Sequence, residues 1–303
     1  MARPADVAED VYFPLRYLNL VNLVPVDLNS ILYGNEMAIA EFLCMTGCAD
    51  QAEEWKDRAA KRSEAMHALM WNETLHSYFD YNLTSSAQHT FVPADNDTES
   101  FESDPAPEGM QVLYAASQFY PFWTGAAPAS LREDPAAVTK AYERVAAYLE
   151  LRAGGVPATN FRTGQQWDQP SVWPPLMHIL IAGLVNTPSP STAGNNTDSS
   201  PHALALALPP RYLDSTFCTW YATGGSTSET PQLDGFTDED VGIMFEKYDD
   251  ATLNEAGGGG EYEVVEGFGW TNGVLIWVVE TFGNELVRPD CGDIEAADVE
   301  AEK

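Results

Sequence analysis

Apolar residues recur at intervals of three and four along much of the chain, a spacing typical of helices that bury one face. The pattern is clearest over residues 27–47, which begin at Asp27, and in the stretch that follows Asp50. Asp is favoured at the start of a helix because its carboxylate accepts hydrogen bonds from free backbone N–H groups. One side of the second stretch collects Trp55, Ala59, Met66, Leu69 and Met70. Two long helices are therefore predicted in this part of the chain.

Weaker forms of the same pattern predict further helices. They cover residues 108–120, 135–152, 174–185, 203–222, 236–246 and 267–282. Pro209 and Pro210 should interrupt the fourth of them, because proline lacks the N–H that a helix interior uses. The alternation typical of strands occurs only over residues 77–83 and 262–265. The sequence thus predicts an all-α fold of paired helices.

Two stretches, residues 84–107 and 186–201, are rich in Ser, Thr, Asn and Pro. Such composition is typical of surface insertions, and neither stretch reads as a linker between domains. The chain after Pro289 is short and acidic. We therefore expect one domain over residues 1–288 and an acidic tail over residues 289–303.

The net charge of the chain disfavours some classes of binding partner. Asp and Glu number 46 against 15 Lys and Arg, which gives a formal net charge of -31. Such a surface repels nucleic acid and anionic lipid, whereas a neutral sugar is indifferent to it. No run of about 18 apolar residues is present, so no membrane span is expected. Solubility alone would also explain the charge.

The cysteines and the glycosylation signals bear on the compartment. Cys44, Cys48, Cys218 and Cys291 are too scattered for a disulfide scaffold, and packing or one disulfide is favoured over zinc. Asn-x-Ser/Thr sequons at Asn72, Asn82, Asn96 and Asn195 favour a secreted or lumenal protein, yet residues 1–10 contain no signal peptide. Both observations agree if the sequence lacks its natural beginning.

Three segments place aromatic and carboxylate side chains in loops. In residues 166–175, QWDQPSVWPP, the two prolines suit the first turn of a helix, so the preceding residues form a loop. Flat rings stack on sugars, while amides and carboxylates bind their hydroxyls. Gln166, Trp167, Asp168 and Trp173 are therefore candidate sugar-binding residues. The alternative is that both tryptophans only pack beneath the loop.

The second segment is MFEKYD, residues 244–249, and it places Glu246 at the end of a predicted helix. Hydrolysis of a glycosidic bond uses two carboxyl groups, and this Glu beside two aromatic residues could be one of them. The alternative is a solvated helix end, in which Glu246 and Lys247 face water.

The third segment runs from the glycines of residues 257–260 through Glu261 to Gly273. Its glycines fit neither a phosphate-binding loop nor a dinucleotide fingerprint. A flexible linker is the alternative, and the aromatic residues Phe268 and Trp270 count against it.

Together these segments resemble the trehalase family of glycoside hydrolases. QWDQPSVWPP is similar to the second of its two signatures, except that Val172 stands where a small residue is expected. MFEKYD followed by GGGGEYEVVEGFGWTNG resembles its C-terminal catalytic stretch, and PVDLNSILY and LMWNETLHSYFDYNL resemble its middle helices. The similarity covers most of the chain in the expected order.

The resemblance implies an (α/α)6 toroid of six inner and six outer helices, which this chain would form only in part. It implies inverting hydrolysis of α,α-trehalose to two glucoses, with Glu246 as general base and Glu261 as a substrate-binding carboxylate. The loop of Gln166, Trp167, Asp168 and Trp173, with Phe268 and Trp270, would shape the pocket. No metal ion or cofactor is expected.

The family's first signature and its general-acid Asp, in a Ser-Gly-Trp-Asp-Phe type of segment, have no counterpart here. Proton transfer to the leaving oxygen is worth about 10² to 10⁴ in rate. We therefore expect a truncated trehalase with weak or no activity by itself. The alternatives are a non-catalytic trehalose-binding or vestigial protein, and an (α/α)6 glycosidase for another disaccharide.

Overall fold

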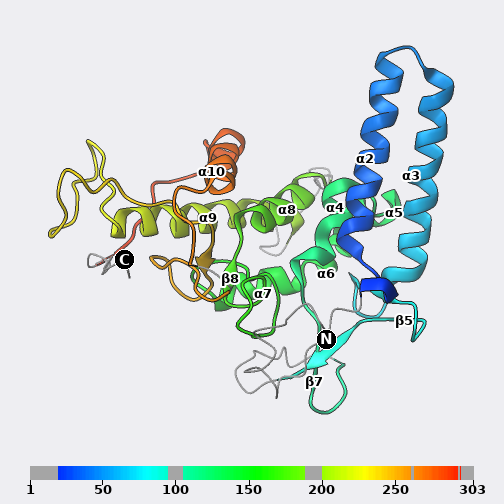
Figure 1. Cartoon of the computed structure of the whole chain (residues 1–303), viewed down its shortest axis with the longest axis horizontal. Helices are drawn as coiled ribbons and strands as arrows, with labels where there is room; N and C mark the ends of the chain where they lie inside the picture. The colour runs from blue at the N-terminus through cyan, green and yellow to red at the C-terminus, as the bar shows by residue number, and fades with distance from the viewer. Residues whose placement is uncertain (1–19, 95–104, 188–199, 261–262, 293, 295–303) are drawn as a thin grey trace. The chain divides into compact units, whose positions relative to one another are not determined.

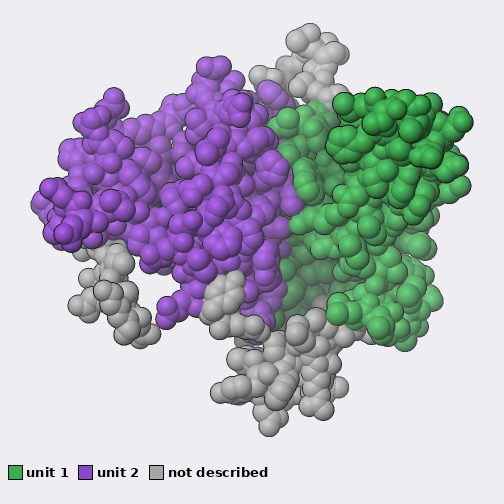
Figure 2. All heavy atoms as spheres, turned by 45° about the horizontal axis from the view of Figure 1, so that its top comes forward, with its two compact units in different colours: residues 1–142, 159–163, 182–194 green, residues 143–158, 164–181, 195–303 purple. Residues whose placement is uncertain are grey.

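The computed structural model describes residues 20–94, 105–187, 200–260, 263–292 and 294. The chain forms two compact units, coloured separately in Figure 2. The first unit comprises residues 1–142, 159–163 and 182–194, and the second comprises residues 143–158, 164–181 and 195–303.

The first unit begins with a hairpin of two long helices, α2 (Val26–Met45) and α3 (Ala49–Met70), which lie side by side in Figure 1. Both helices confirm the predicted ranges. The residues at the helix starts differ from the expectation, since Asp27 and Asp50 lie in the first turns and make no cap. There a carboxylate favours the positive end of the helix dipole. The backbone N–H of Val26 is instead bound by the Asp80 carboxylate, at 2.8 Å.

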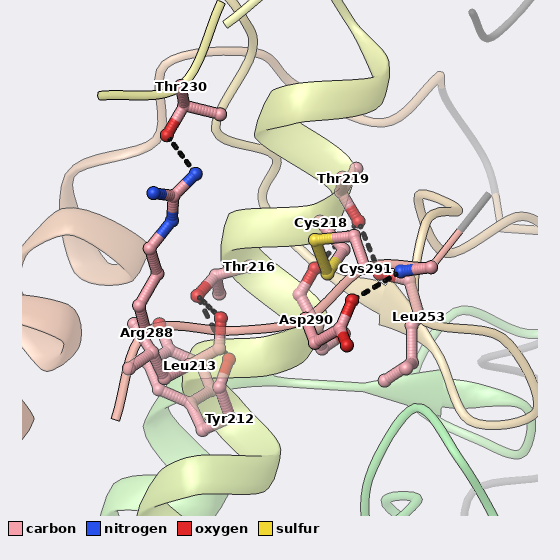
Figure 3. The surroundings of a disulfide bond; sticks show 12 residues. Tyr212, Leu213, Thr216, Cys218, Thr219, Thr230, Leu253, Arg288, Asp290 and Cys291 are labelled. Atoms are coloured by element: carbon pink, nitrogen blue, oxygen red, sulfur yellow. Dashed lines mark hydrogen bonds between the residues drawn. A yellow bond between two sulfur atoms is a disulfide. The ribbon is translucent and has the colours of Figure 1, made fainter. Parts of the chain in front are cut away.

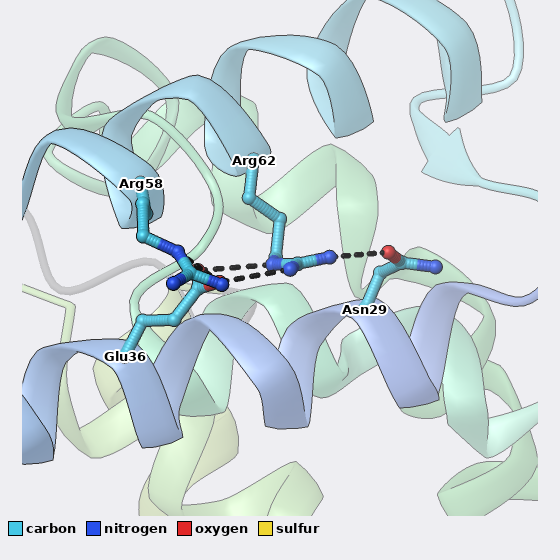
Figure 4. A network of polar contacts seen from close by, with 4 residues as sticks. All are labelled: Asn29, Glu36, Arg58 and Arg62. Carbon is cyan, nitrogen blue, oxygen red and sulfur yellow. Dashed lines mark hydrogen bonds and ion pairs between the residues drawn. The ribbon is translucent and has the colours of Figure 1, made fainter. Parts of the chain in front are cut away.

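The two helices are joined by a partly buried ion pair, drawn in Figure 4. Arg62 of α3 binds Glu36 of α2 through two nitrogens, at 2.8 Å and 3.0 Å, and a third nitrogen donates to Asn29 at 2.9 Å. Arg58 lies 3.9 Å from the same carboxylate. Glu36 is buried, and Arg62 supplies both hydrogen bonds to its carboxylate while Arg58 adds a second positive charge nearby.

Two short β-hairpins of similar structure follow α3. The first pairs β2 (Trp71–Asn72) with β3 (Ser77–Tyr78), and the second pairs β4 (Tyr81–Asn82) with β5 (Ala87–Gln88). β1 (Leu23–Val24) adds to β4. The predicted strand pattern at residues 77–83 is thus confirmed as two short strands.

Each of these hairpins turns at the Asn of a sequon. The Asn72 side chain accepts hydrogen bonds from the backbone N–H groups of residues 74 and 75, and the Asn82 side chain accepts those of residues 84 and 85. Four residues after each Asn, His76 and Ser86 adopt positive φ angles of 48° and 51°. Asn in these two sequons is therefore also a turn-forming residue. The sequons at Asn96 and Asn195 lie outside the described residues.

The rest of the first unit corrects one predicted helix. Residues 108–120 form β7 (Met110–Val112), paired with β6 (Phe91–Pro93), and then the 3-10 helix η3 (Ala116–Phe119). The buried Asn160 side chain binds the backbone at Val112 and Tyr114, which holds this stretch extended. β5 and β6 also show that the predicted insertion at residues 84–107 is partly a strand region.

Short helices complete this part of the chain. They are α4 (Tyr120–Thr124), α5 (Ala129–Arg132), α6 (Pro135–Ala141) and, in the second unit, α7 (Glu143–Leu151). The predicted helix 135–152 is thus split at Tyr142. Asp134 caps α6 by accepting from the N–H groups of residues 136 and 137.

Three longer helices follow. They are α8 (Pro174–Val185), α9 (Pro201–Ala222) and α10 (Gly269–Phe282), and α9 packs against α10 within the second unit. All three confirm predicted ranges. The expected interruption of α9 is wrong, since the helix continues through Pro209 and Pro210. Leu208 and Tyr212 are buried on either side of the prolines, and this packing offsets the missing N–H groups.

A disulfide fastens the end of the chain to α9, as Figure 3 shows. Cys218 in α9 is bonded to Cys291, and nearby Arg288 donates to the Thr230 hydroxyl at 2.6 Å. The expectation of one disulfide is confirmed, and Cys44 and Cys48 are free and exposed. The assignment of residues 289–303 to a separate tail stays a prediction, although Cys291 is tied to α9.

Candidate active site

The site is built on an extended segment, residues 244–249, that the sequence predicts as the end of a helix. The predicted helix 236–246 is wrong. The backbone of Met244 accepts from Gly267 at 2.7 Å, and Glu246 donates to Val265 at 2.9 Å. On the other side, the Lys247 carbonyl accepts from Gly257 at 2.9 Å. Bonds to later parts of the chain replace those of a helix.

The same segment is paired along a further edge. β8 (Ser171–Val172) is antiparallel to β9 (Tyr248–Asp249), with Val172 opposite Tyr248. This pairing joins the QWDQPSVWPP stretch to MFEKYD, which are far apart in the sequence. Two of the predicted site segments therefore lie next to each other.

Glu246 and Lys247 are both buried, with 2% and 0% of their surfaces exposed. The alternative of a solvated helix end is therefore wrong, because the two side chains do not face water and the segment is not helical. Charged side chains are buried only where the surroundings supply hydrogen bonds. Burial lowers the pKa of Lys247, and the neighbouring charge of Glu246 acts against this shift.

Four aromatic side chains form one group, which we call the aromatic cluster: Trp167, Trp173, Phe268 and Trp270. Trp167 and Trp173 are stacked, with ring centroids 3.8 Å apart. Trp270 meets both of them edge-on, at 6.4 Å and 5.6 Å, and Phe268 lies 4.3 Å from Trp270. Trp173 is fully buried, whereas Trp167 is 47% exposed. The cluster therefore has a buried base and an open outer ring.

Hydrogen bonds tie the cluster to the other site residues. The Trp270 indole donates to the backbone carbonyl of Glu246 at 2.8 Å. The Trp173 indole donates to the backbone carbonyl of Gln166 at 2.9 Å. The structure thus brings Gln166, both loop tryptophans, Phe268 and Trp270 together with the segment that carries Glu246.

The glycine run 257–260, here called the glycine loop, is fixed at both ends. Gly260 donates to the Gly164 carbonyl at 3.1 Å, and a Cβ at Gly260 would lie 2.7 Å from the Cβ of Gln166. Gly259 and Gly260 have positive φ angles of 74° and 105°, which glycine adopts without strain. The alternative of a free linker is therefore wrong. Glu261, which follows directly, lies outside the described residues.

Comparisons with known proteins identify the family of the chain. The family model described as trehalase matches residues 14–226 and 231–283. The chain belongs to the trehalase family. A trehalase from Oryctolagus cuniculus is 32% identical over 267 residues, which cover 87% of this chain and 36% of the relative. A trehalase from Apis mellifera is 28% identical over 282 residues, 90% of this chain and 36% of the relative.

Among solved structures, a neutral trehalase from Saccharomyces cerevisiae superposes with a TM-score of 0.53 at 22% identity. The match covers 86% of this chain and 38% of that one. The predicted helical fold of the trehalase type is thereby confirmed. The chain spans just over a third of the length of these trehalases.

Asp168 plays a backbone role in this trehalase-family site. It shapes the turn that carries Trp167, because its N–H donates to Gln165 and its carbonyl accepts from Ser171. Its side chain is half-buried. A role of Asp168 in binding sugar stays a prediction.

A buried polar network that no sequence pattern predicted centres on Asp250, directly after the Glu246 segment. Asp250 is fully buried and accepts from Gln169 at 2.7 Å, and Arg152 lies 3.7 Å from the same oxygen. The Asp250 carbonyl accepts from Gly154 at 2.9 Å. This network holds the Trp167 loop to the end of the Glu246 segment. The only signal in the sequence is the second Asp of the run EKYDD.

No group of three or more His, Cys, Asp or Glu side chains in the described part of the chain is arranged to hold a metal ion. None of the described helices is long and apolar enough to cross a membrane.

Proposed function

We propose that this chain carries the general-base part of a trehalase active site, in a protein that hydrolyses α,α-trehalose to two glucoses with inversion. The observation that carries the proposal is the burial of Glu246 on a segment bonded to the aromatic cluster, in a chain of the trehalase family. A buried carboxylate beside aromatic rings is suited to act on a sugar shielded from bulk water.

In this reaction Glu246 takes a proton from a water molecule. The water oxygen attacks one anomeric carbon of trehalose from the face opposite the bridging oxygen, and the bond from that carbon to the bridging oxygen breaks. The bridging oxygen receives a proton from a carboxylic acid, so one water is consumed and two glucoses are formed. The attacked glucose leaves as the β anomer and the other remains α.

We assign the general acid to a Ser-Gly-Trp-Asp-Phe type of segment that this sequence does not contain. By itself the chain would then have weak or no activity, because the bridging oxygen would leave unprotonated. The alternative proposal, a non-catalytic trehalose-binding protein, keeps the same sugar contacts without turnover.

The sugar contacts proposed here come from the aromatic cluster and its loop. The exposed face of Trp167 is available to stack on a glucose ring, and Trp173 supports it from below. Gln166, Asp168 and Glu261 would bind hydroxyl groups, while Phe268 and Trp270 would shape the pocket. A neutral disaccharide is neither attracted nor repelled by the net charge of the chain, so this charge does not oppose binding at the site.

Glucose release by the protein that the complete gene encodes tests this function. We expect hydrolysis of trehalose and not of maltose or kojibiose, and loss of turnover in Glu246→Gln with trehalose affinity within a few-fold. Glu263→Gln, an exposed carboxylate nearby, is the matched control and should keep full activity. Retained activity in Glu246→Gln would remove Glu246 from the base role. Binding without turnover in the unaltered protein would favour the non-catalytic alternative.

We also propose that the protein is secreted or lumenal. The Cys218–Cys291 disulfide supports this proposal, because disulfides persist in oxidising compartments. Counting free thiols in protein isolated from its source tests it, since two thiols are expected from Cys44 and Cys48. Four free thiols would contradict the proposal.

A further inference from the structure

The buried side chain of Lys247 makes contacts that its place beside Glu246 in the sequence does not explain. Its Nζ donates to the backbone carbonyls of Gly258 and Gly259, at 2.8 Å and 2.9 Å. The same ammonium lies 5.6 Å from the ring centroid of Trp173, within the range of a cation–π interaction. One buried side chain therefore contacts both the glycine loop and the base of the aromatic cluster.

Burying this ammonium costs free energy that a neutral side chain would not cost. Burial lowers the pKa of Lys247 because desolvation disfavours the charged form, and the charge of Glu246 acts against this. A methionine would fill a similar volume without a charge to desolvate. The ammonium differs from such a side chain by donating hydrogen bonds, and both acceptors belong to the glycine loop.

The glycine loop packs closely against Lys247 at Gly257. A Cβ at Gly257 would lie 2.9 Å from the Tyr248 carbonyl oxygen and 3.0 Å from the Cγ of Lys247. The Gly257 N–H donates to the Lys247 carbonyl. Lys247 thus holds the first half of the loop through its backbone and the middle through its side chain, while Gly164 holds the end.

We propose that Lys247 is a positioning residue, which fixes the glycine loop against Gln166 and the aromatic cluster and so forms the sugar-binding surface before substrate arrives. That trehalose binds to this surface rests on the proposed function. That Lys247 fixes the glycine loop does not depend on the proposed function, and it is measured separately.

Two readouts on the protein that the complete gene encodes test the proposal: hydrogen exchange of the Gly257 and Gly260 amides, and trehalose affinity from tryptophan fluorescence. In Lys247→Met we expect both amides to exchange at least tenfold faster, with the α9 amides unchanged, and the dissociation constant for trehalose to rise at least tenfold. Lys247→Arg keeps donors for the two carbonyls and should restore part of both effects. Lys61→Met removes an exposed lysine and should match the unaltered protein.

Unchanged exchange of both amides in Lys247→Met would overturn the proposal. Faster exchange with unchanged trehalose affinity would overturn the positioning role. If the unaltered protein binds no trehalose, the proposed function fails, while the exchange data still decide whether Lys247 fixes the loop. Should Lys247→Met not fold, Lys247→Gln is subject to the same comparison, because it keeps a shorter donor without the charge.

Discussion

The indole of Trp167 lies parallel to that of Trp173, with 3.8 Å between ring centroids and 4° between ring planes. The two residues differ in exposure, since Trp173 is buried and Trp167 is half exposed. The buried ring therefore fixes the orientation of the exposed one. A planar apolar surface held in this way is suited to stack on the C–H face of a sugar.

Truncating each ring should separate binding from folding. Trp167→Ala should weaken trehalose binding about tenfold, which is about 1.4 kcal/mol, with little change in stability. Trp173→Ala should lower the free energy of unfolding by about 3–5 kcal/mol, because it leaves a cavity in the core. Titration with trehalose and urea unfolding measure the two effects. Equal loss of stability in both variants would show that Trp167 is only a packing residue.

Asp80 should make the stability of the chain depend on pH. Burial raises the pKa of this carboxyl, the Val26 N–H acts against the rise, and Asp27 adds to it. A group whose pKa is higher in the folded state stabilises the fold below its unfolded pKa, and this contribution is lost as the pH rises through the folded value. Asp80→Asn keeps an acceptor for Val26 and does not titrate. Its stability relative to the unaltered chain should therefore rise from about pH 4 towards neutrality.

Urea unfolding of both chains at several pH values measures this difference. Asp57→Asn, on the exposed face of α3, is the control and should show a smaller change with pH. A difference for Asp80→Asn that is constant or falls with rising pH would contradict the assigned shift.

The Cys218–Cys291 disulfide should stabilise the second unit. The two cysteines are 73 residues apart, and closing a loop of that length stabilises by about 4 kcal/mol in the chain-entropy model. Replacing both by Ala should lower the urea midpoint accordingly. The matched double variant Cys44→Ala, Cys48→Ala removes two exposed free thiols and should not change it. Equal midpoints in all three chains would show that the bond contributes nothing.

The ion pair between Glu36 and Arg62 should contribute more than a surface pair. Glu36→Gln removes the buried charge that accepts both hydrogen bonds from Arg62, so we expect a loss of about 2 kcal/mol in the free energy of unfolding. Glu53→Gln breaks the exposed pair with Lys56 and should cost about 0.5 kcal/mol or less. Similar losses in the two variants would contradict the importance of burial here.

Local pattern was sufficient for the long helices of this chain. α2, α3 and α8 follow the predicted ranges closely, because their apolar spacing is a property of the segments themselves. The region 236–246 was predicted wrongly because its structure depends on bonds to residues 265–267, which no local pattern contains. The prediction that Pro209 interrupts α9 was wrong for the same reason, because tertiary packing stabilises the helix there.

Some features of the candidate site could likewise be predicted from the sequence, and others could not. Composition made Trp167 and Trp173 candidates, with packing as the alternative. The family resemblance added Phe268 and Trp270, and it singled out Glu246 within an extended segment that the sequence predicts as a helix end. The burial of Lys247 could not be predicted, because a lysine beside a glutamate is usually solvated. Asp250 escaped notice because its partners Gln169 and Arg152 are distant in the sequence.

Proton NMR of the first products tests the central claim most directly. With the protein that the complete gene encodes, trehalose should give α-glucose and β-glucose in equal amounts before mutarotation, because water attacks opposite the leaving oxygen. Glu246→Gln should give neither. Formation of α-glucose alone at early times, or equal product from Glu246→Gln, would contradict an inverting reaction with Glu246 as its base.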